Sequence, residues 1–171
     1  VMVLYDLIVK KVINSACEVN KEYLKISHFE LDDGNRKKKT LIADFLWAKN
    51  TLNMQVKGKT RTEKLVLGTQ DLASYVYQFM FNPPIKEEVN VILTTGKKLN
   101  TYQYKALEKG LKSAAAKSSY KTLHIANEAL AGDDKKELWL AEDKYYLPVR
   151  YMLTDDDGDS FQQTLTKIYV E

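Results

Sequence analysis

Residues 67–81 read LGTQDLASYVYQFMF, and this stretch decides which fold we expect. Apolar side chains recur at the i, i+3, i+4, i+7, i+8 spacing of one helix face. They are Leu72, Tyr75, Val76, Phe79 and Met80. A second apolar row consists of Ala73, Tyr77 and Phe81, so that Ser74 and Gln78 form a narrow polar seam. The pattern predicts one principal apolar helix over residues 70–81.

Both ends of this helix carry recognisable signals. Thr69 is a suitable N-cap, and Asp71 in the first turn suits the helix dipole. Asn82-Pro83-Pro84 ends the helix, because proline lacks an amide donor and clashes with the preceding turn. A helix that is apolar on two sides has to be covered on more than one side. We therefore expect a sheet that curves around it.

The remaining sequence is typical of strands. Leu52, Met54 and Val56 alternate with polar residues, as in a strand with one buried face, and Gly58-Lys59 is expected to turn the chain. Residues 2–13 fit a short helix, and residues 110–118 a long hairpin loop. Strands are expected at 23–31, 36–48, 52–56, 60–66, 89–94, 102–106, 119–127, 135–142, 144–154 and 159–170. The predicted fold class is mainly β, a single curved antiparallel sheet (a half-open barrel) wrapped around the apolar helix.

Length and charge restrict the classes of function. The 171 residues suit a single domain, residues 1–171, with one substantial core. The net charge of +3 comes from 26 basic and 23 acidic residues, without the broad basic stripe that nucleic-acid binding requires. The basic run at residues 35–39 reads as a solvated hairpin tip. Nucleic acid is therefore not an expected partner.

The N-terminal region raises the question of export. The segment from Val12 to Cys17 loosely resembles a lipidation signal, but Asn14 replaces the expected aliphatic residue, and we interpret Cys17 as a small half-buried side chain. A single cysteine excludes an intrachain disulfide. The sequence opens on Val1 with structured-looking residues, so we expect that N-terminal strands and a signal peptide of a longer protein precede it.

Motifs for catalysis and metal binding are weak. Residues 155–159, DDDGD, invite a calcium loop, but the first and twelfth ligand positions hold Leu153 and Thr164, so a hairpin turn fits better. His28 and His124 lie in predicted strands without neighbouring ligand residues, which favours structural roles. Catalytic residues, metal ligands and cofactors are all predicted to be absent, and we expect no enzyme activity.

Aromatic residues are abundant. Eleven tyrosines, five phenylalanines and two tryptophans exceed what one flat sheet needs. Most are expected in the core, and the alternative is that some line a hydrophobic cavity between helix and sheet. Tyr75, Phe79 and Met80 are the predicted contacts of a hydrophobic ligand.

Three parts of the chain resemble exported bacterial proteins grouped as domain of unknown function 3108. They are ADFLW at 43–47, GTQDLAS at 68–74, and LWLAED at 138–143 with LPVR at 147–150 and Asp157-Gly158. The resemblance covers most of residues 15–170. It implies a periplasmic or envelope location and a half-barrel similar to the lipoprotein carriers of the bacterial envelope. It supplies no established reaction.

Pro148 and Arg150, within the LPVR segment, also have roles of their own. Pro148 lacks a ladder donor, so its strand is expected at an edge or with a local break. Arg150 is expected to pair with Asp44 or Glu142, with an anionic headgroup as the alternative.

The sequence thus predicts a non-catalytic periplasmic protein, at most peripheral to the membrane, that binds a lipid or acyl chain on its concave face. The alternative is an envelope scaffold or assembly factor that binds a protein partner through a sheet edge.

Overall fold

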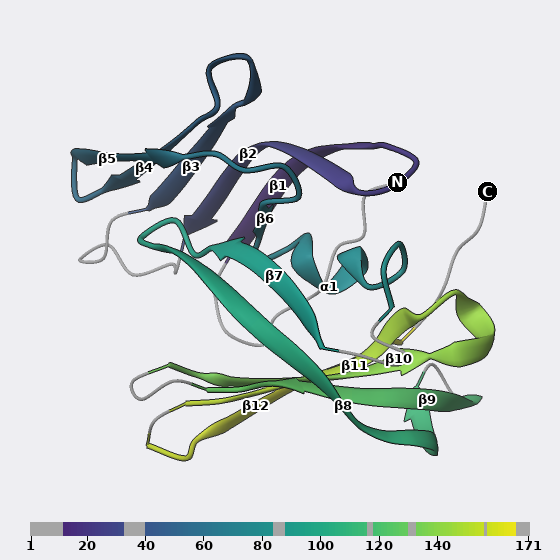
Figure 1. The fold of residues 1–171 in the computed structure, drawn as a ribbon. Helices are drawn as coiled ribbons and strands as arrows, with labels where there is room; N and C mark the ends of the chain where they lie inside the picture. Colours follow the sequence, from purple (N-terminus) through teal and green to yellow (C-terminus); the bar gives the residue numbers. More distant parts are fainter. Residues whose placement is uncertain are drawn as a thin grey trace. The chain divides into compact units, whose positions relative to one another are not determined.

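The computed structural model describes residues 12–32, 40–83, 88–115, 118–129, 133–155 and 157–166 (Figure 1). The protein is mainly β, as predicted. The chain divides into two compact units. Unit 1 comprises residues 1–74 and 92–100, and unit 2 comprises residues 75–91 and 101–171.

Unit 1 is built on a five-stranded antiparallel sheet. Its strands follow the chain in the order β1 (Val12–Val19), β2 (Leu24–Asp32), β3 (Leu41–Leu46), β4 (Thr51–Val56) and β5 (Lys59–Lys64). The short helix η1 (Trp47–Lys49) joins β3 to β4. Side chains alternate between the faces of the strands, as the spacing around Leu52 and Met54 predicts, and both of these residues are completely buried.

The buried face of this sheet is covered by residues that follow β5. The two-residue strand β6 (Gln70–Asp71) pairs in parallel with the last residues of β7 (Val89–Thr94), Gln70 opposite Leu93 and Asp71 opposite Thr94. The Gln70 side-chain amide donates to the Leu24 carbonyl oxygen of β2 at 2.9 Å. A polar side chain thereby ties the covering segment to the sheet.

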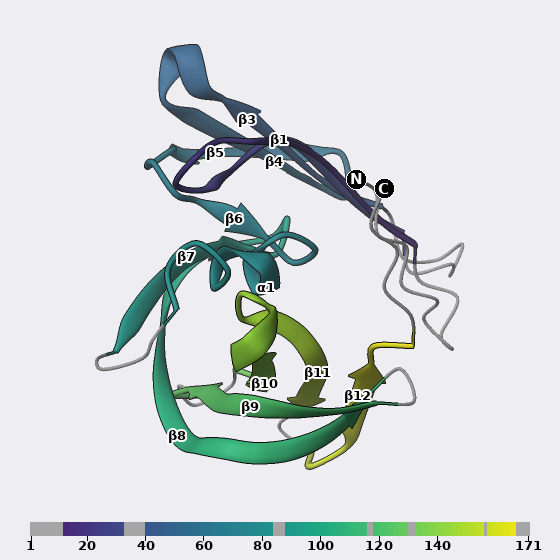
Figure 2. The same cartoon turned by 90° about the vertical axis from the view of Figure 1, so that its right-hand side faces the viewer.

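Unit 2 holds most of a curled antiparallel sheet. Its strands are β8 (Leu99–Ala115), β9 (Ser118–Asn127), β10 (Lys135–Ala141), β11 (Leu147–Thr154) and β12 (Ser160–Thr164), with η2 (Glu142–Lys144) between β10 and β11. The full strand order is β12-β11-β10-β9-β8-β7-β6. Register shifts along β8 at Ala106/Glu108 and Lys109/Leu111 bend this long strand, and Figure 2 shows the resulting curl. The predicted half-barrel is confirmed for this sheet.

The local break predicted at Pro148 is also confirmed. The register between β10 and β11 shifts at Trp139/Leu140, where Leu140 faces Pro148. Because β12 pairs on the other side of β11, the proline lies in an interior strand and is accommodated by a bulge.

The predicted helix over residues 70–81 is wrong. Gln70 and Asp71 are a strand, and the helix α1 (Tyr75–Gln78) has four residues. The Asp71 carboxylate oxygen Oδ1 accepts the amide protons of Ala73 and Ser74, both at 2.8 Å, so Asp71 rather than Thr69 caps the turn before α1. After Gln78 the chain continues in turns, with Met80 N–H donating to the Tyr77 carbonyl oxygen. The apolar residues at helical spacing therefore lie in a single helical turn and in the non-helical turns on either side of it.

Three other expectations differ from the structure. The described strands form two sheets rather than one. Residues 110–115 and 118 continue β8 and β9, because these strands pair through Ala115 and Ser118 instead of opening into a loop. The hairpin turn between β4 and β5 lies at Lys57-Gly58, one residue before the predicted tip. The helix expected at residues 2–13 lies outside the described residues except for positions 12 and 13, which belong to β1, and the basic run at 35–39 and Pro84 also lie outside them.

Candidate functional site

The interior of unit 2 contains a cluster of four aromatic side chains, which we call the aromatic cluster: Tyr75, Phe79, Tyr104 and Tyr151. Tyr75 belongs to α1, and Phe79 follows it by four residues, so both side chains point the same way. Tyr104 comes from β8 and Tyr151 from β11. Short-range capping by Asp71 and long-range strand pairing together assemble the cluster.

The rings of the aromatic cluster contact one another at edge-to-face or tilted angles. The Phe79 and Tyr104 ring centroids are 5.1 Å apart with planes at 67°. The Tyr75 ring lies 6.2 Å from that of Tyr104 and 6.4 Å from that of Tyr151. Tyr75, Phe79 and Tyr104 expose at most 1% of their surface. These are the separations at which aromatic pairs attract each other.

Two hydroxyl groups of the aromatic cluster are left unsatisfied. Within the described part of the chain, the hydroxyl oxygens of Tyr75 and Tyr104 are buried and have no partner at hydrogen-bond geometry, although the side chains of Tyr104 and Tyr151 lie near enough to that of Tyr75 to interact with its hydroxyl. Burial raises the pKa of Tyr75 well above its ordinary value of 10.0, and the neighbouring Tyr104 and Tyr151 raise it further. Burial likewise raises the pKa of Tyr104, and that of Tyr151 to about 12. The phenols stay protonated at neutral pH and are therefore hydrogen-bond donors.

The three predicted ligand contacts have different outcomes. Tyr75 and Phe79 belong to the aromatic cluster, whereas Met80 is half-buried in the turn after α1. The sequence prediction missed Tyr104 and Tyr151. Tyr102 and Tyr104 are two residues apart, so the sequence predicts that they share a strand face. It does not predict which strands contact α1. That information lies in the long-range pairing.

Both histidines pair with carboxylates. His28 Nδ1 lies 2.7 Å from Asp44 Oδ1, on neighbouring positions of β2 and β3. His124 Nε2 lies 2.9 Å from Glu137 Oε2, and the His124 ring stacks on Trp139 at 4.2 Å. The predicted position of each histidine in a strand is confirmed.

Glu137 belongs to a compact polar group on the face of unit 2 that carries Trp139. Burial by itself would raise the pKa of Glu137, but hydrogen bonds from Lys135 and His124 outweigh it and lower that pKa below its ordinary value of 4.5. Lys135 Nζ lies 2.8 Å from Glu137 Oε1. The group forms an ion-paired surface on β9 and β10.

The predicted partners of Arg150 and the predicted burial of Cys17 are wrong. Arg150 lies over the Trp139 ring at 4.3 Å and donates to Gln162 Oε1 at 2.7 Å, because β10 and β12 flank its strand. Cys17 is exposed, since β1 is an edge strand in the described sheet.

The turn at residues 155–159 matches the hairpin interpretation. Asp155 Oδ1 accepts the amide protons of Asp157 and Asp159, at 3.1 and 2.9 Å.

Among the described residues, no group of three or more His, Cys, Asp or Glu side chains is placed to hold a metal ion. None of the helices in the described ranges has the length and apolar character needed to cross a membrane.

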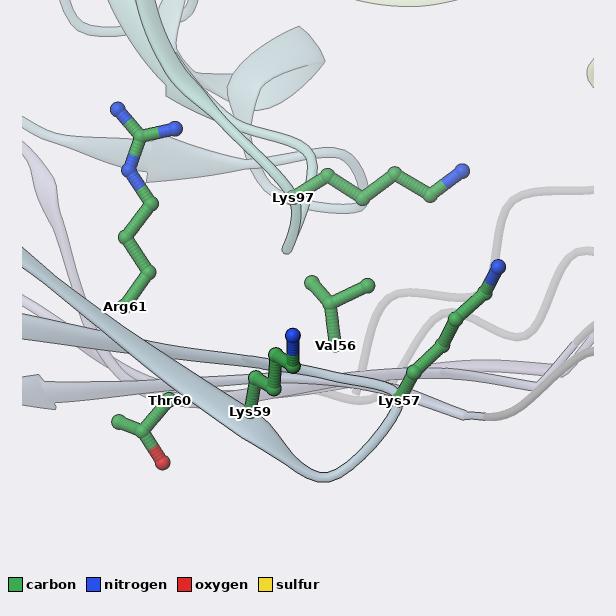
Figure 3. Close-up of a pocket in the computed structure, with 6 residues that line it drawn as sticks. All are labelled: Val56, Lys57, Lys59, Thr60, Arg61 and Lys97. Carbon is green, nitrogen blue, oxygen red and sulfur yellow. The ribbon is translucent and has the colours of Figure 1, made fainter.

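A second candidate site lies on unit 1. A hollow of about 420 Å³, which we call the basic hollow, lies between the β4–β5 hairpin and the β7–β8 turn (Figure 3). It is lined by Val56, Lys57, Lys59, Thr60, Arg61 and Lys97. No pattern in the sequence predicts this hollow, because Lys97 is distant in the chain from the hairpin.

Comparison with known proteins identifies the family. The family model described as "Protein of unknown function (DUF3108)" matches residues 5–166. The chain belongs to this family, as the resemblance of its motifs implies. No curated protein and no solved structure matches the chain. The expected likeness to envelope lipoprotein carriers therefore stays a prediction.

Proposed function

We propose that this DUF3108 protein is a non-catalytic binding protein whose curled sheet holds a lipid or acyl chain against the aromatic cluster. One observation carries the proposal. In the described chain, the hydroxyl groups of Tyr75 and Tyr104 are buried in an aromatic interior without hydrogen-bond partners. A ligand that is apolar but ends in a carbonyl or carboxyl oxygen supplies both the apolar contact and the missing acceptor.

The energetics of buried donors favour such a ligand. Leaving a buried hydroxyl without a partner costs about 1–3 kcal/mol. An acceptor oxygen that reaches both hydroxyls recovers much of this cost, whereas an alkane recovers none. Because burial keeps the phenols protonated, they orient an oxygen and do not act as nucleophiles. The chemistry is recognition, without a cofactor.

Access to the aromatic cluster depends on α1. The rings contact one another, so a ligand reaches the hydroxyls when α1 and Phe79 separate from the sheet. A helix of four residues contributes few backbone hydrogen bonds of its own, so local opening costs little compared with opening a long helix. The short helix that replaces the predicted long one thus suits a movable cover.

The proposed place of action is the periplasm or another part of the cell envelope. It rests on the exported character implied by the motifs at residues 43–47 and 138–143. An acyl group that moves between membranes there needs protection from water, which a curled sheet with an aromatic interior provides.

The edge of unit 1 favours a second candidate, an envelope scaffold that binds a protein partner. In the described sheet, β1 is an edge strand of eight residues with Glu18 as its charged side chain. Natural edges are usually protected by several charges or by proline. β5, the opposite edge, carries Lys59, Arg61, Glu63 and Lys64 and is protected in this way. A partner strand is therefore expected at β1.

A binding assay separates the two candidates. Full-length chain is titrated with a fluorescent palmitate, and micromolar binding is expected. The Tyr75→Phe/Tyr104→Phe variant loses two hydrogen bonds of about 1 kcal/mol each, so its affinity should fall about 30-fold. Tyr145→Phe removes a hydroxyl from a side chain that is 83% exposed and should bind as the wild type does.

The absence of palmitate binding at saturating protein contradicts the acyl proposal. The scaffold candidate is then examined by hydrogen exchange at the amides of residues 12–19. Protection that appears when envelope extract is added supports a partner at β1, and unchanged exchange contradicts it.

A further inference from the structure

The basic hollow of unit 1 has a chemistry that the proposed acyl site does not use. Four of its six lining side chains are basic, namely Lys57, Lys59, Arg61 and Lys97. Figure 3 shows the lysines arranged around Val56, with Lys97 approaching from the β7–β8 turn. The hollow thus places several positive charges around a small apolar contact.

Most of this charge is not neutralised. Among the residues that the structure describes, the ammonium groups of Lys57, Lys59 and Lys97 have no ion-pair partner. Arg61 is paired with Glu63, whose Oε1 lies 2.6 Å from Arg61 Nη2. The described lining therefore presents three uncompensated cations, in a protein whose total net charge is +3. Like charges held together repel each other, and an anion relieves that repulsion.

The hairpin rim of the hollow has an unusual turn. Lys57 and Gly58 both have positive φ, 51° and 76°, as in the two-residue turns that favour Asn-Gly. A lysine at the first position is disfavoured by the local backbone. Lys57 nevertheless brings a long cationic side chain to the rim of the hollow. Asparagine, which forms this turn more readily, would bring no charge.

The opposite rim is anchored by packing. A Cβ atom on Gly96 would lie 3.0 Å from Leu41 Cβ and 3.2 Å from a Phe29 ring carbon, so this turn lies close against the β2–β3 surface of the same unit. The Thr94 hydroxyl accepts the Gly96 amide proton at 3.1 Å, and Thr95 N–H donates to the Lys98 carbonyl oxygen at 3.1 Å. The backbone at Lys97 is therefore held in place.

We propose that the basic hollow binds a phosphate-bearing anion. A phosphate group offers several acceptor oxygens to Lys57, Lys59 and Lys97 at once, and lysine ammonium groups bind it as point charges. The same chemistry is presented by the headgroup of an anionic phospholipid and by a soluble phosphate. The site is separate from the aromatic cluster and does not depend on acyl binding.

Two measurements on the full chain test the site and distinguish the two sources. In the first, amide NMR shifts are followed while inorganic phosphate is added. In the second, the protein is sedimented with vesicles of phosphatidylcholine, with and without phosphatidylglycerol. Saturating shifts at Lys57, Gly58 and Lys97 with phosphate indicate a soluble ligand. Sedimentation that depends on phosphatidylglycerol, without such shifts, indicates a headgroup.

The variants Lys57→Asn and Lys97→Gln each remove one cation from the hollow. Each should weaken binding about five-fold, as expected for one basic residue near an anionic surface. Lys57→Asn should keep or raise the melting temperature, because asparagine suits the positive φ. Lys49→Gln is the matched control, since it removes an exposed charge from η1, at the other end of β4.

The proposal is overturned by any of three results. One is the absence of binding in both measurements. Another is wild-type affinity in the Lys57→Asn/Lys97→Gln double variant. The third is an equal loss in Lys49→Gln, which means that overall charge, and not the hollow, governs binding.

Discussion

The buried Asp71 of unit 1 and the buried tyrosines of unit 2 differ in whether their polar atoms have hydrogen-bond partners. In unit 1, the buried Asp71 carboxylate accepts protons from the Ser15 hydroxyl at 2.6 Å and from the amides of Ala73 and Ser74. In unit 2, the buried hydroxyls of Tyr75 and Tyr104 have no partner at hydrogen-bond geometry among the described residues. The first arrangement builds a turn and ties it to β1. The second makes the fold less stable than phenylalanine would, and for this reason we propose that it serves ligand recognition.

The largest expected effect comes from removing a side chain of the aromatic cluster in unit 2. Phe79 is completely buried against Tyr104, so Phe79→Ala should lower the free energy of unfolding by about 3–5 kcal/mol. Phe81→Ala is the matched control, because Phe81 is half-buried and should cost less. Chemical denaturation measures both. Equal losses in the two variants would mean that the aromatic cluster is not the core of unit 2.

The next effect concerns the satisfied network of unit 1. Asp71→Ala leaves the amides of Ala73 and Ser74 without their acceptor in a buried place and should cost about 2–3 kcal/mol. Asp71→Asn keeps an acceptor oxygen and should cost less. Thermal melts of the two variants make the comparison. A melting temperature of Asp71→Ala equal to that of the wild type contradicts the role of this turn.

A smaller effect appears only in acid. The lowered pKa of Glu137 means that its ion pairs stabilise the protein above the ordinary value of 4.5, and that this contribution is lost as the pH falls through the lower folded value. Asp71 has the opposite sign, because burial raises its pKa, so its contribution is lost as the pH rises through the raised value.

Glu137→Gln should therefore reduce stability at pH 7 and should flatten the loss of stability below pH 4.5. Unfolding free energies measured from pH 3 to pH 7 test this prediction. A variant whose pH profile runs parallel to that of the wild type shows that the pairing with Lys135 and His124 is not linked to folding.

The smallest expected effect is the most specific. Tyr104→Phe removes a buried hydroxyl that has no partner at hydrogen-bond geometry in the described structure, so the free energy of unfolding should rise, by about 1 kcal/mol, the low end of the cost of an unsatisfied buried hydroxyl. Ser15→Ala, which removes the hydroxyl that donates to Asp71, should destabilise instead. A loss above about 2 kcal/mol in Tyr104→Phe would show that its hydroxyl is partnered.

The sequence predicts the strands of this protein better than its helix. Alternation around Leu52, Met54 and Val56 identified β4, since a half-buried strand has a period of two. The apolar spacing over residues 70–81 led to a wrong prediction of a long helix. The Asp71 carboxylate instead accepts the amide protons of the turn that follows it, and Gln70 pairs with Leu93 as a strand. Tertiary pairing overrode local helical preference at that point.

The candidate site was predictable in part. Tyr75 and Phe79 were found from their i, i+4 spacing, which survives in a single helical turn. Tyr104 and Tyr151 reach them through the curl of the sheet, which depends on register shifts in β8 that local sequence does not specify. The basic hollow depends on two turns brought together by folding, so charge counting along the chain did not find it.

The central claim is that Tyr75 and Tyr104 donate hydrogen bonds to the oxygen of a bound acyl group. Isotope-edited infrared spectroscopy of a bound ¹³C-carbonyl palmitate methyl ester measures this directly, because hydrogen bonding lowers the carbonyl stretching frequency. The account predicts a lowered frequency in the wild type and a return to the hydrocarbon value in Tyr75→Phe/Tyr104→Phe. A bound ester whose frequency is the same in both proteins would contradict it.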